Sequence, residues 1–126
     1  MTLPDPSAAS LTSGLDDAQY HRLAHGALAA IEATVDRWLD DDLIDIDTHR
    51  TGGLLELSFP DGSKIILNTQ PPLHEIWMAA RAGGYHYRWQ DGAWRDTRSG
   101  QEFFAALSAQ ASAQSGCSLV FVAPAT

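Results

Sequence analysis

The sequence predicts an α+β domain in which an antiparallel sheet of five to six strands is covered on one face by two helices. Three observations predict this class. Apolar residues recur at helical spacing near each end of the chain, their period falls to two between those segments, and glycine-containing turns separate the strand-like runs. Strands joined by tight turns pair antiparallel with their neighbours. A helix before the sheet and a helix after it can both pack on one face, which gives a two-layer αβ sandwich.

The first helix is expected over residues 15–39. Asp16 and Gln19 have the spacing of a capping box, and Leu15 with Tyr20 has that of a hydrophobic staple. The apolar positions that recur at helical spacing are Tyr20, Leu23, Ala24, Ala27, Leu28, Ile31, Val35 and Trp38. The opposite face is polar and carries His21, Arg22, His25, Glu32, Asp36 and Asp40.

Alternation of apolar and polar residues predicts strands at 44–49, 54–59, 64–70, 74–79, 85–89 and 93–96. It points Ile65 and Leu67 toward the core and Asn68 and Gln70 outward. For the next strand, periodicity alone leaves open whether Trp77 faces the core or the open side of the sheet. An outward tryptophan flanked by amides is a candidate binding anchor, because tryptophan is enriched at the centres of protein interfaces.

The second helix is expected from Ser99 to about Gln114. Ser99 and Glu102 match a capping box, and Gly116 suits the C-cap. The core-facing residues of this helix are expected to be Phe103, Phe104, Leu107 and Ala111. The apolar tail 118–122 is expected to be buried, either as a last strand or as a packed extension.

Composition limits the classes of function. The chain has 126 residues, which fits one domain at 15–126 after a flexible leader at 1–14. A net charge of −8 argues against a nucleic-acid partner, which requires clustered lysine and arginine. The N-terminus does not have the pattern of a signal peptide, and no run approaches the length of a membrane span. With Cys117 as the single cysteine, these features favour a reducing compartment and predict a cytoplasmic protein without a membrane partner.

The most unusual segment is the acidic run that ends the first helix and continues toward the first strand. Glu32, Asp36 and Asp40 are four residues apart and form a ladder on one helix face. Such hard oxygen ligands suit iron and other divalent cations, but their spacing does not enclose an ion, so binding should be weak and poorly selective. The simplest interpretation is a solvated acidic surface. Arg37 weakens the case for a metal, and His21 with His25 is a pair of low specificity.

Motifs for catalysis are not found. The chain has no Glu-x-x-His pair, no glycine-rich phosphate loop and no Gly-x-Ser-x-Gly elbow. Cys117 follows the second helix without an evident base beside it, which argues against a nucleophile. Binding is therefore the better class of function than catalysis.

Residues 59–87 closely resemble the frataxin family, in particular its bacterial, CyaY-type members. The pattern Asn-x-Gln-x-Pro-x-x-x-Ile-Trp from Asn68 to Trp77, followed by Gly-Gly-Tyr-His from Gly83 to His86, is highly specific. The resemblance extends over about residues 17–122 and includes Asp45-Ile-Asp47.

This resemblance implies an αβ sandwich and a role in iron–sulfur cluster assembly, with iron (Fe2+ or Fe3+) bound weakly by an acidic ridge. It implies docking of the ridge on a cysteine desulfurase that supplies sulfur to a scaffold protein, and it favours the outward orientation of Trp77. The ridge residues that it implies are Glu32, Asp36, Asp40, Asp41, Asp42, Asp45 and Asp47. The partner-binding residues that it implies are Asn68, Gln70 and Trp77.

The chain departs from the family pattern where Ala33, Thr34 and Arg37 stand in place of acids, which puts the stoichiometry of iron in doubt more than the partner. The main hypothesis is a non-enzymatic, iron-binding regulator or chaperone of cluster assembly. One alternative is a ferroxidase or iron-storage protein. Another is an acidic interaction module with no role in metal binding.

Overall fold

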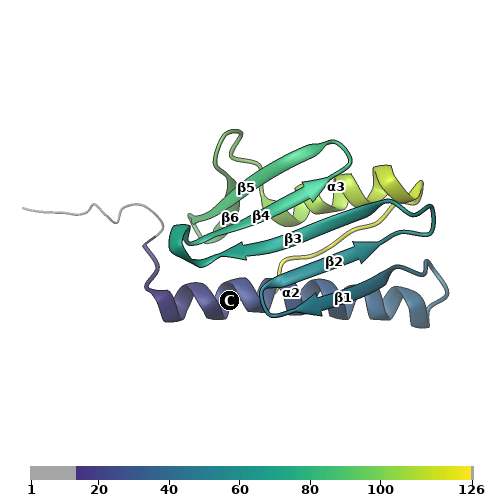
Figure 1. The fold of residues 1–126 in the computed structure, drawn as a ribbon, viewed down its shortest axis with the longest axis horizontal. Coiled ribbons are helices and arrows are strands. Elements are labelled where there is room, and N and C mark those ends of the chain that lie inside the picture. Colours follow the sequence, from purple (N-terminus) through teal and green to yellow (C-terminus); the bar gives the residue numbers. More distant parts are fainter. Residues whose placement is uncertain (1–13, 126) are drawn as a thin grey trace, which may run out of the picture.

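The computed structural model describes residues 14–125 and has the predicted α+β architecture (Figure 1). The expected leader lies, except for Gly14, outside the described residues. Within them, two α-helices flank six strands, which form one sheet in the order β1-β2-β3-β4-β5-β6. All neighbouring strands are antiparallel. The elements are α2 (Asp17–Asp40), β1 (Asp47–Thr51), β2 (Leu54–Ser58), β3 (Lys64–Gln70), the 3-10 turn η1 (Pro71–Leu73), β4 (Glu75–Ala80), β5 (Gly83–Gln90), β6 (Ala93–Asp96) and α3 (Phe103–Ser115).

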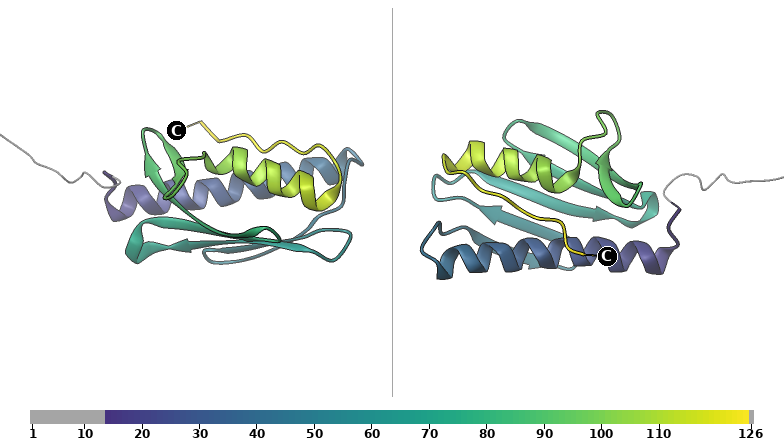
Figure 2. Two further views of the ribbon diagram at one scale, coloured as in Figure 1. Left: turned by 90° about the horizontal axis from the view of Figure 1, so that it is seen from above. Right: turned by 180° about the vertical axis from the view of Figure 1, so that it is seen from behind.

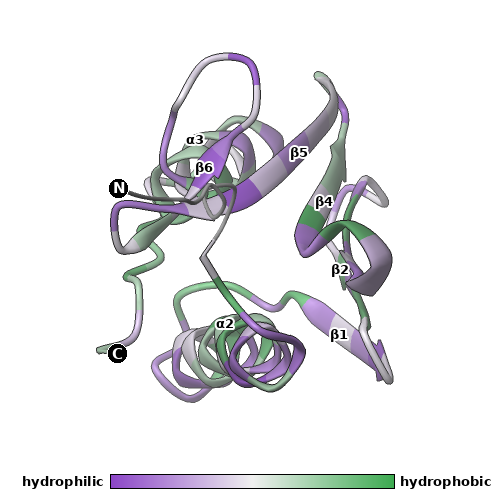
Figure 3. Cartoon of the chain, turned by 90° about the vertical axis from the view of Figure 1, so that its left-hand side faces the viewer, coloured by the Kyte–Doolittle hydropathy of each residue, from purple (hydrophilic) through white to green (hydrophobic). Residues whose placement is uncertain are grey.

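Both helices lie on the same face of the sheet, and the other face is open (Figure 2). Seen end-on, α2 and α3 stand on one side and strands β1, β2 and β4 on the other (Figure 3). The buried core between the two layers includes Leu28, Ile31, Leu57, Leu67 and Leu107. Within the described residues, no helix is long and apolar enough to cross a membrane.

Helix α2 begins as the sequence predicts. The side chain of Asp16 accepts a hydrogen bond from the Gln19 backbone N–H at 2.7 Å, and Gln19 Oε1 accepts one from the Asp16 N–H at 3.0 Å. The hydroxyl of the fully buried Tyr20 donates to the Glu75 carbonyl at 2.6 Å and accepts from the Gln70 N–H at 3.1 Å. The start of the helix is thereby attached to β3 and β4.

The strand faces also follow the predicted alternation. Ile65 and Leu67 of β3 are fully buried, and so are Ile76 and, nearly, Met78 of β4. The first strand begins at Asp47 and not at Ile44 as expected. Residues 44–46 still alternate between exposed and covered positions because Ile46 packs into the core, but they have no strand partner.

The predicted start of the second helix is wrong. Helix α3 begins at Phe103, and Glu102 is its N-cap, with carboxylate oxygens that accept from the Phe104 and Ala105 N–H groups at 2.8 and 2.9 Å. Ser99 instead lies in a turn whose N–H groups are held by the carboxylate of Asp96. A glutamate that caps the helix itself explains why Ser99 is not needed as a cap.

The C-terminal tail is a packed extension and not a strand. It runs between α3 and α2 on the helix side of the sheet, as Figure 2 shows. Leu119 and Phe121 are buried, whereas Val120 and Val122 are exposed, so half of the tail and not all of it is covered. Ser112 Oγ accepts from the Leu119 N–H at 2.9 Å, and Ser108 Oγ accepts from the Phe121 N–H at 2.8 Å. Two serines of α3 therefore hold the tail's backbone in place of a sheet.

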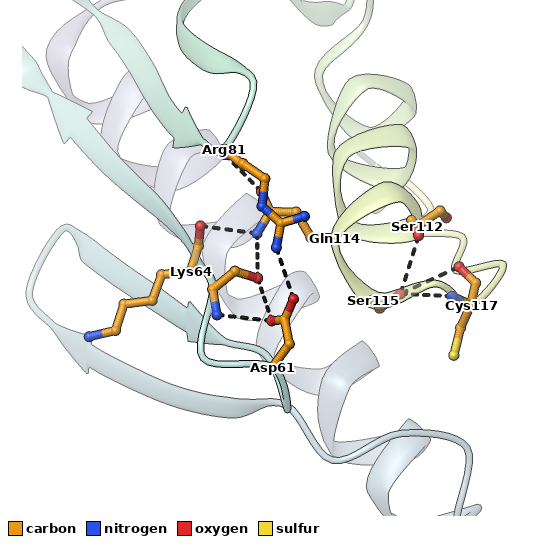
Figure 4. Close-up of polar contacts among 8 residues, drawn as sticks. Asp61, Lys64, Arg81, Ser112, Gln114, Ser115 and Cys117 are labelled. Atoms are coloured by element: carbon orange, nitrogen blue, oxygen red, sulfur yellow. Dashed lines mark hydrogen bonds and ion pairs between the residues drawn. The ribbon is translucent and has the colours of Figure 1, made fainter.

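The C-terminal end of α3 is also attached to the sheet, through Gln114 (Figure 4). Its side chain is buried, accepts from the Arg81 N–H at 2.9 Å, and donates to Ser63 Oγ at 3.1 Å and to the Lys64 carbonyl at 3.2 Å. Asp61 completes the cluster by an ion pair with Arg81 at 2.8 Å. The cluster joins the β2–β3 turn, the β4–β5 turn and the helix layer.

Candidate functional site

The acidic segment forms a band from the end of α2 to the start of β1. Asp36 and Asp40 are exposed on the last turns of α2, Asp41 is its C-cap, and Asp42 follows. Asp45 is exposed in the connection, and Asp47 is exposed as the first residue of β1. We call these six exposed aspartates the acidic ridge. None of them takes part in a side-chain ion pair with another described residue.

The end of α2 is an unfavourable place for this charge. The Leu43 N–H donates to the Trp38 carbonyl at 2.8 Å and the Asp42 N–H to the Leu39 carbonyl at 3.1 Å, which is the pattern of a Schellman motif. Asp42 occupies its left-handed position, usually a glycine, at φ 55°. A helix C-terminus carries roughly half a negative charge, so acids there add repulsion to that between neighbours. An external cation or a basic partner would relieve both.

Glu32, the remaining predicted ridge residue, has a different environment. Its carboxylate forms an ion pair with Arg50 of β1 at 2.6 Å, and its side chain is 30% exposed. Arg50 also places Nη2 at 3.1 Å from His25 Nδ1. This ion pair places the side of α2 that carries Glu32 next to β1. It also neutralises the charge of Glu32 within the chain. Arg50 could not have been assigned this role from its position in the sequence.

The described residues contain no group of three or more histidine, cysteine or acidic side chains that could enclose a metal ion. The ridge aspartates supply oxygen ligands of the type that iron accepts, spread from the end of α2 to the start of β1. Each exposed carboxylate can therefore contribute one or two ligands to an ion that otherwise keeps its water.

The open sheet face carries the second group of predicted residues. Cross-strand pairing aligns Asn68, Trp77 and His86 in one row and Gln70, Glu75 and Arg88 in the next. Trp77 is half-buried on the open face, since its neighbours Ile76 and Met78 point into the core. Its ring stacks on that of His86, with centroids 4.1 Å apart and an interplanar angle of 7°.

Glu75 differs most from its expected environment. It lies on the open face beside Trp77, as alternation indicates, yet it is only 4% exposed. Its Oε2 accepts from Arg88 Nη2 at 2.6 Å, and its Oε1 accepts from Trp77 Nε1 at 2.8 Å. The spacing Glu-x-Trp places Glu75 and Trp77 on one face of β4. Arg88 comes beside them only through the register between β4 and β5, which cannot be read from the sequence.

Two cavities lie away from the ridge. One of about 410 Å³ is mostly apolar and lies between the first half of α2, the β5–β6 hairpin and the tail, with Leu23, Trp89 and Trp94 in its wall. The other, of about 360 Å³, is more polar and is lined by His86, Arg98 and Gln101 among others. The second cavity therefore adjoins the row that contains Trp77.

Comparison with known proteins gives a consistent result. The family model of the frataxin-like domain matches residues 13–117. The iron-sulfur cluster assembly proteins CyaY of Burkholderia mallei strain SAVP1 and Burkholderia pseudomallei strain K96243 are 54% identical over 109 residues, which is 86% of this chain and 100% of each relative.

Solved structures agree. The frataxin of Psychromonas ingrahamii superposes with a TM-score of 0.77 at 35% identity, covering 86% of this chain and 99% of that one. A trimeric frataxin of Saccharomyces cerevisiae, described as complexed with ferrous, has a TM-score of 0.62 at 21% identity, covers 88% of this chain and 90% of its own, and supports the fold alone. The predicted resemblance is confirmed: this chain belongs to the frataxin family.

Proposed function

We propose that this protein is a non-enzymatic regulator and iron chaperone of iron–sulfur cluster assembly. In this proposal the acidic ridge docks on a basic surface of a cysteine desulfurase. The row that contains Asn68 and Trp77, with Gln70 beside it, contacts the iron–sulfur scaffold protein. The assignment to cluster assembly is supported by the relatives named for that process. A cytoplasmic location is proposed from the single cysteine.

The observation that carries the docking proposal is the absence of ion pairs to the ridge aspartates among the described residues, although Arg37 lies in the same turns of α2. Its six aspartates are exposed and form no ion pair within residues 14–125, although those at the end of α2 lie where the helix dipole disfavours acids. Fixed charge of this density steers a basic partner and raises its association rate.

Binding of the desulfurase to ridge variants tests the proposal. The triple variant D36N/D40N/D42N should weaken binding at least about tenfold at low salt. The difference from the wild type should shrink at high salt, because salt screens the attraction between the ridge and a basic partner. The matched control is D91N, which removes an exposed aspartate from the β5–β6 turn. Equal affinity of the triple variant and the wild type would exclude the ridge from docking.

Iron is a cargo in this proposal, and the ridge carboxylates are its candidate ligands. Titration of ¹⁵N-labelled protein with ferrous iron under anaerobic conditions should broaden the amide signals of residues 36–47 progressively and without saturation at one equivalent. The signals of the Gln114 cluster serve as an internal control. The proposal of an acidic module without a metal role requires that no selective broadening occurs.

The ferroxidase or iron-storage alternative is a proposal of a different class. Ferrous loading in anaerobic buffer followed by air should then give oxygen consumption above that of buffer, and the D36N/D40N/D42N variant should abolish the excess. Oxygen consumption equal to that of buffer would exclude this alternative and leave the docking proposal unaffected.

A further inference from the structure

The open face of the sheet contains one buried carboxylate. Glu75 is 4% exposed, although the elements around it leave this face of the sheet uncovered by helices. Its two oxygens are occupied by different donors, Arg88 Nη2 at 2.6 Å and Trp77 Nε1 at 2.8 Å. His86 Nδ1 lies at 3.9 Å from the same oxygen that accepts from Trp77.

The backbone at Glu75 is held as firmly as its side chain. The Tyr20 hydroxyl donates to its carbonyl at 2.6 Å from the core side of the sheet. Strand pairing places Glu75 opposite Gln70 on one side and Arg88 on the other. The carboxylate therefore has little freedom to move, and it constrains the groups bonded to it.

Stability does not explain the presence of this residue. In its ion pair the Glu75 side chain is 5% exposed and that of Arg88 is 36% exposed. Desolvation of the buried carboxylate offsets the attraction to Arg88, and apolar replacements of buried charges are often neutral or stabilising. Retaining a carboxylate here therefore suggests a geometric role. The geometry concerned is that of Trp77, the one aromatic ring bonded to it.

Trp77 is constrained on two sides. Its N–H edge is bonded to Glu75, and one ring face is stacked at 4.1 Å on His86, whose side chain is 50% exposed. Because the N–H is satisfied within the chain, a partner need not supply an acceptor for it. What Trp77 and His86 together offer is aromatic surface in a fixed orientation.

We propose that Glu75 is a positioning residue that, supported by Arg88, holds the Trp77 indole against His86. The resulting aromatic pair is a pre-oriented contact that suits an apolar or aromatic side chain of the partner and not a hydrogen-bond acceptor. Pre-orientation removes the cost of immobilising Trp77 on binding. The consequence for affinity rests on the proposed docking function, whereas the consequence for Trp77 does not.

The first test measures Trp77 without any partner. The indole N–H signal is assigned as the one lost in W77F, and its hydrogen exchange is measured in E75M, E75Q and R88Q. In E75M the exchange should accelerate at least about tenfold while the backbone amides of Ile76 and Met78 exchange as before. E75Q keeps an oxygen acceptor and should stay near the wild type, and R88Q should be intermediate. Unchanged exchange in E75M overturns the proposal.

The second test measures affinity for the complex of desulfurase and scaffold. E75M should weaken binding by about threefold to tenfold, and E75Q should restore most of the loss. E56Q is the matched control, since Glu56 also lies on the open face and pairs with Lys64, away from Trp77. If E75M binds with wild-type affinity although W77A binds weakly in the same assay, the positioning role of Glu75 in docking is overturned. If the wild type itself does not bind, the docking function fails and the exchange measurement alone decides the role of Glu75.

Discussion

Asp42 combines two features that are each expected to lower stability. It has φ 55°, a conformation that glycine adopts without strain, and it places a negative charge at the end of α2. The positive φ favours glycine at this position, and the helix C-terminus favours a residue without negative charge. A residue unfavourable in two independent ways is expected where function and not folding determines the choice.

We therefore expect D42G to stabilise the protein by about 0.5–1.5 kcal/mol in urea unfolding, because both the strain and the charge are removed. D42N removes only the charge and should give about 0.3–1 kcal/mol. Both variants should bind the desulfurase less tightly than the wild type.

The matched control is D91G. Asp91 also has a positive φ, of 52°, but it lies in the β5–β6 turn and outside the ridge. It should gain stability from relief of strain without any change in desulfurase binding. A destabilised D42G would contradict the proposed cost.

At the same scale, the sequence predicted which face a residue occupies better than what it touches. The outward positions of Asn68 and Gln70 follow from a period of two. The burial of Glu75 and the pairing of Glu32 with Arg50 depend on side chains brought near by strand register and helix packing. Local spacing does not encode those distances. The sequence therefore predicted one environment for all the ridge acids, whereas in the structure Glu32 is paired and the six aspartates are exposed.

Among the elements, α2 and β1 are linked by an ion pair that also affects a histidine. Burial first, and then the charges of Arg50 and His21, lower the pKa of His25 below its ordinary value of 6.5. The unfolded chain therefore binds a proton at this position more readily than the folded protein does. Stability from the neutral histidine is present above about pH 6.5 and is lost as the pH falls toward the folded pKa.

H25N should therefore lose less stability than the wild type between pH 7.5 and pH 5.5, because asparagine offers Arg50 an acceptor and does not titrate. Urea unfolding at three pH values in this range gives the two slopes. H49N, at an exposed position of β1, is the control and should keep the wild-type slope. Parallel slopes for H25N and the wild type would show that His25 does not contribute.

The tail depends on α3 for its backbone hydrogen bonds. Ser112 Oγ both accepts from the Leu119 N–H and donates to the Leu119 carbonyl, at 2.9 and 3.0 Å. S112A should cost about 1–3 kcal/mol and speed amide exchange at Leu119, because both backbone groups lose their partner. S118A, on the exposed part of the tail, should change neither measurement.

Element boundaries were harder to predict than element types. Ser99 and Glu102 fit a capping box by spacing, but Glu102 is itself the N-cap and Ser99 belongs to a turn. The tail could not be assigned from its short apolar run, because its hydrogen bonds go to serine side chains of α3. Local patterns identify what a segment can form, while the tertiary partner decides what it does form.

For the molecule as a whole, Gln114 connects the two layers at the end remote from the start of α2. Replacing it by leucine leaves the Arg81 N–H and the Lys64 carbonyl without their partner. Q114L should therefore destabilise the protein by about 2–3 kcal/mol in urea unfolding. Q110L, at a partly exposed position of the same helix, is the control. A change below about 0.5 kcal/mol for Q114L would show that other groups or water replace its bonds.

The position of β1 has a further consequence. It is an outer strand of the sheet, with β2 on one side and, among residues 14–125, no strand on the other. Such a strand is a template on which a second chain can add, and charged side chains are a common protection against this. Asp47 and Arg50 are placed on β1 itself, with Asp45 just before it. The acids proposed to attract a basic partner would thus also repel another copy of the same acidic chain and protect the open edge from aggregation.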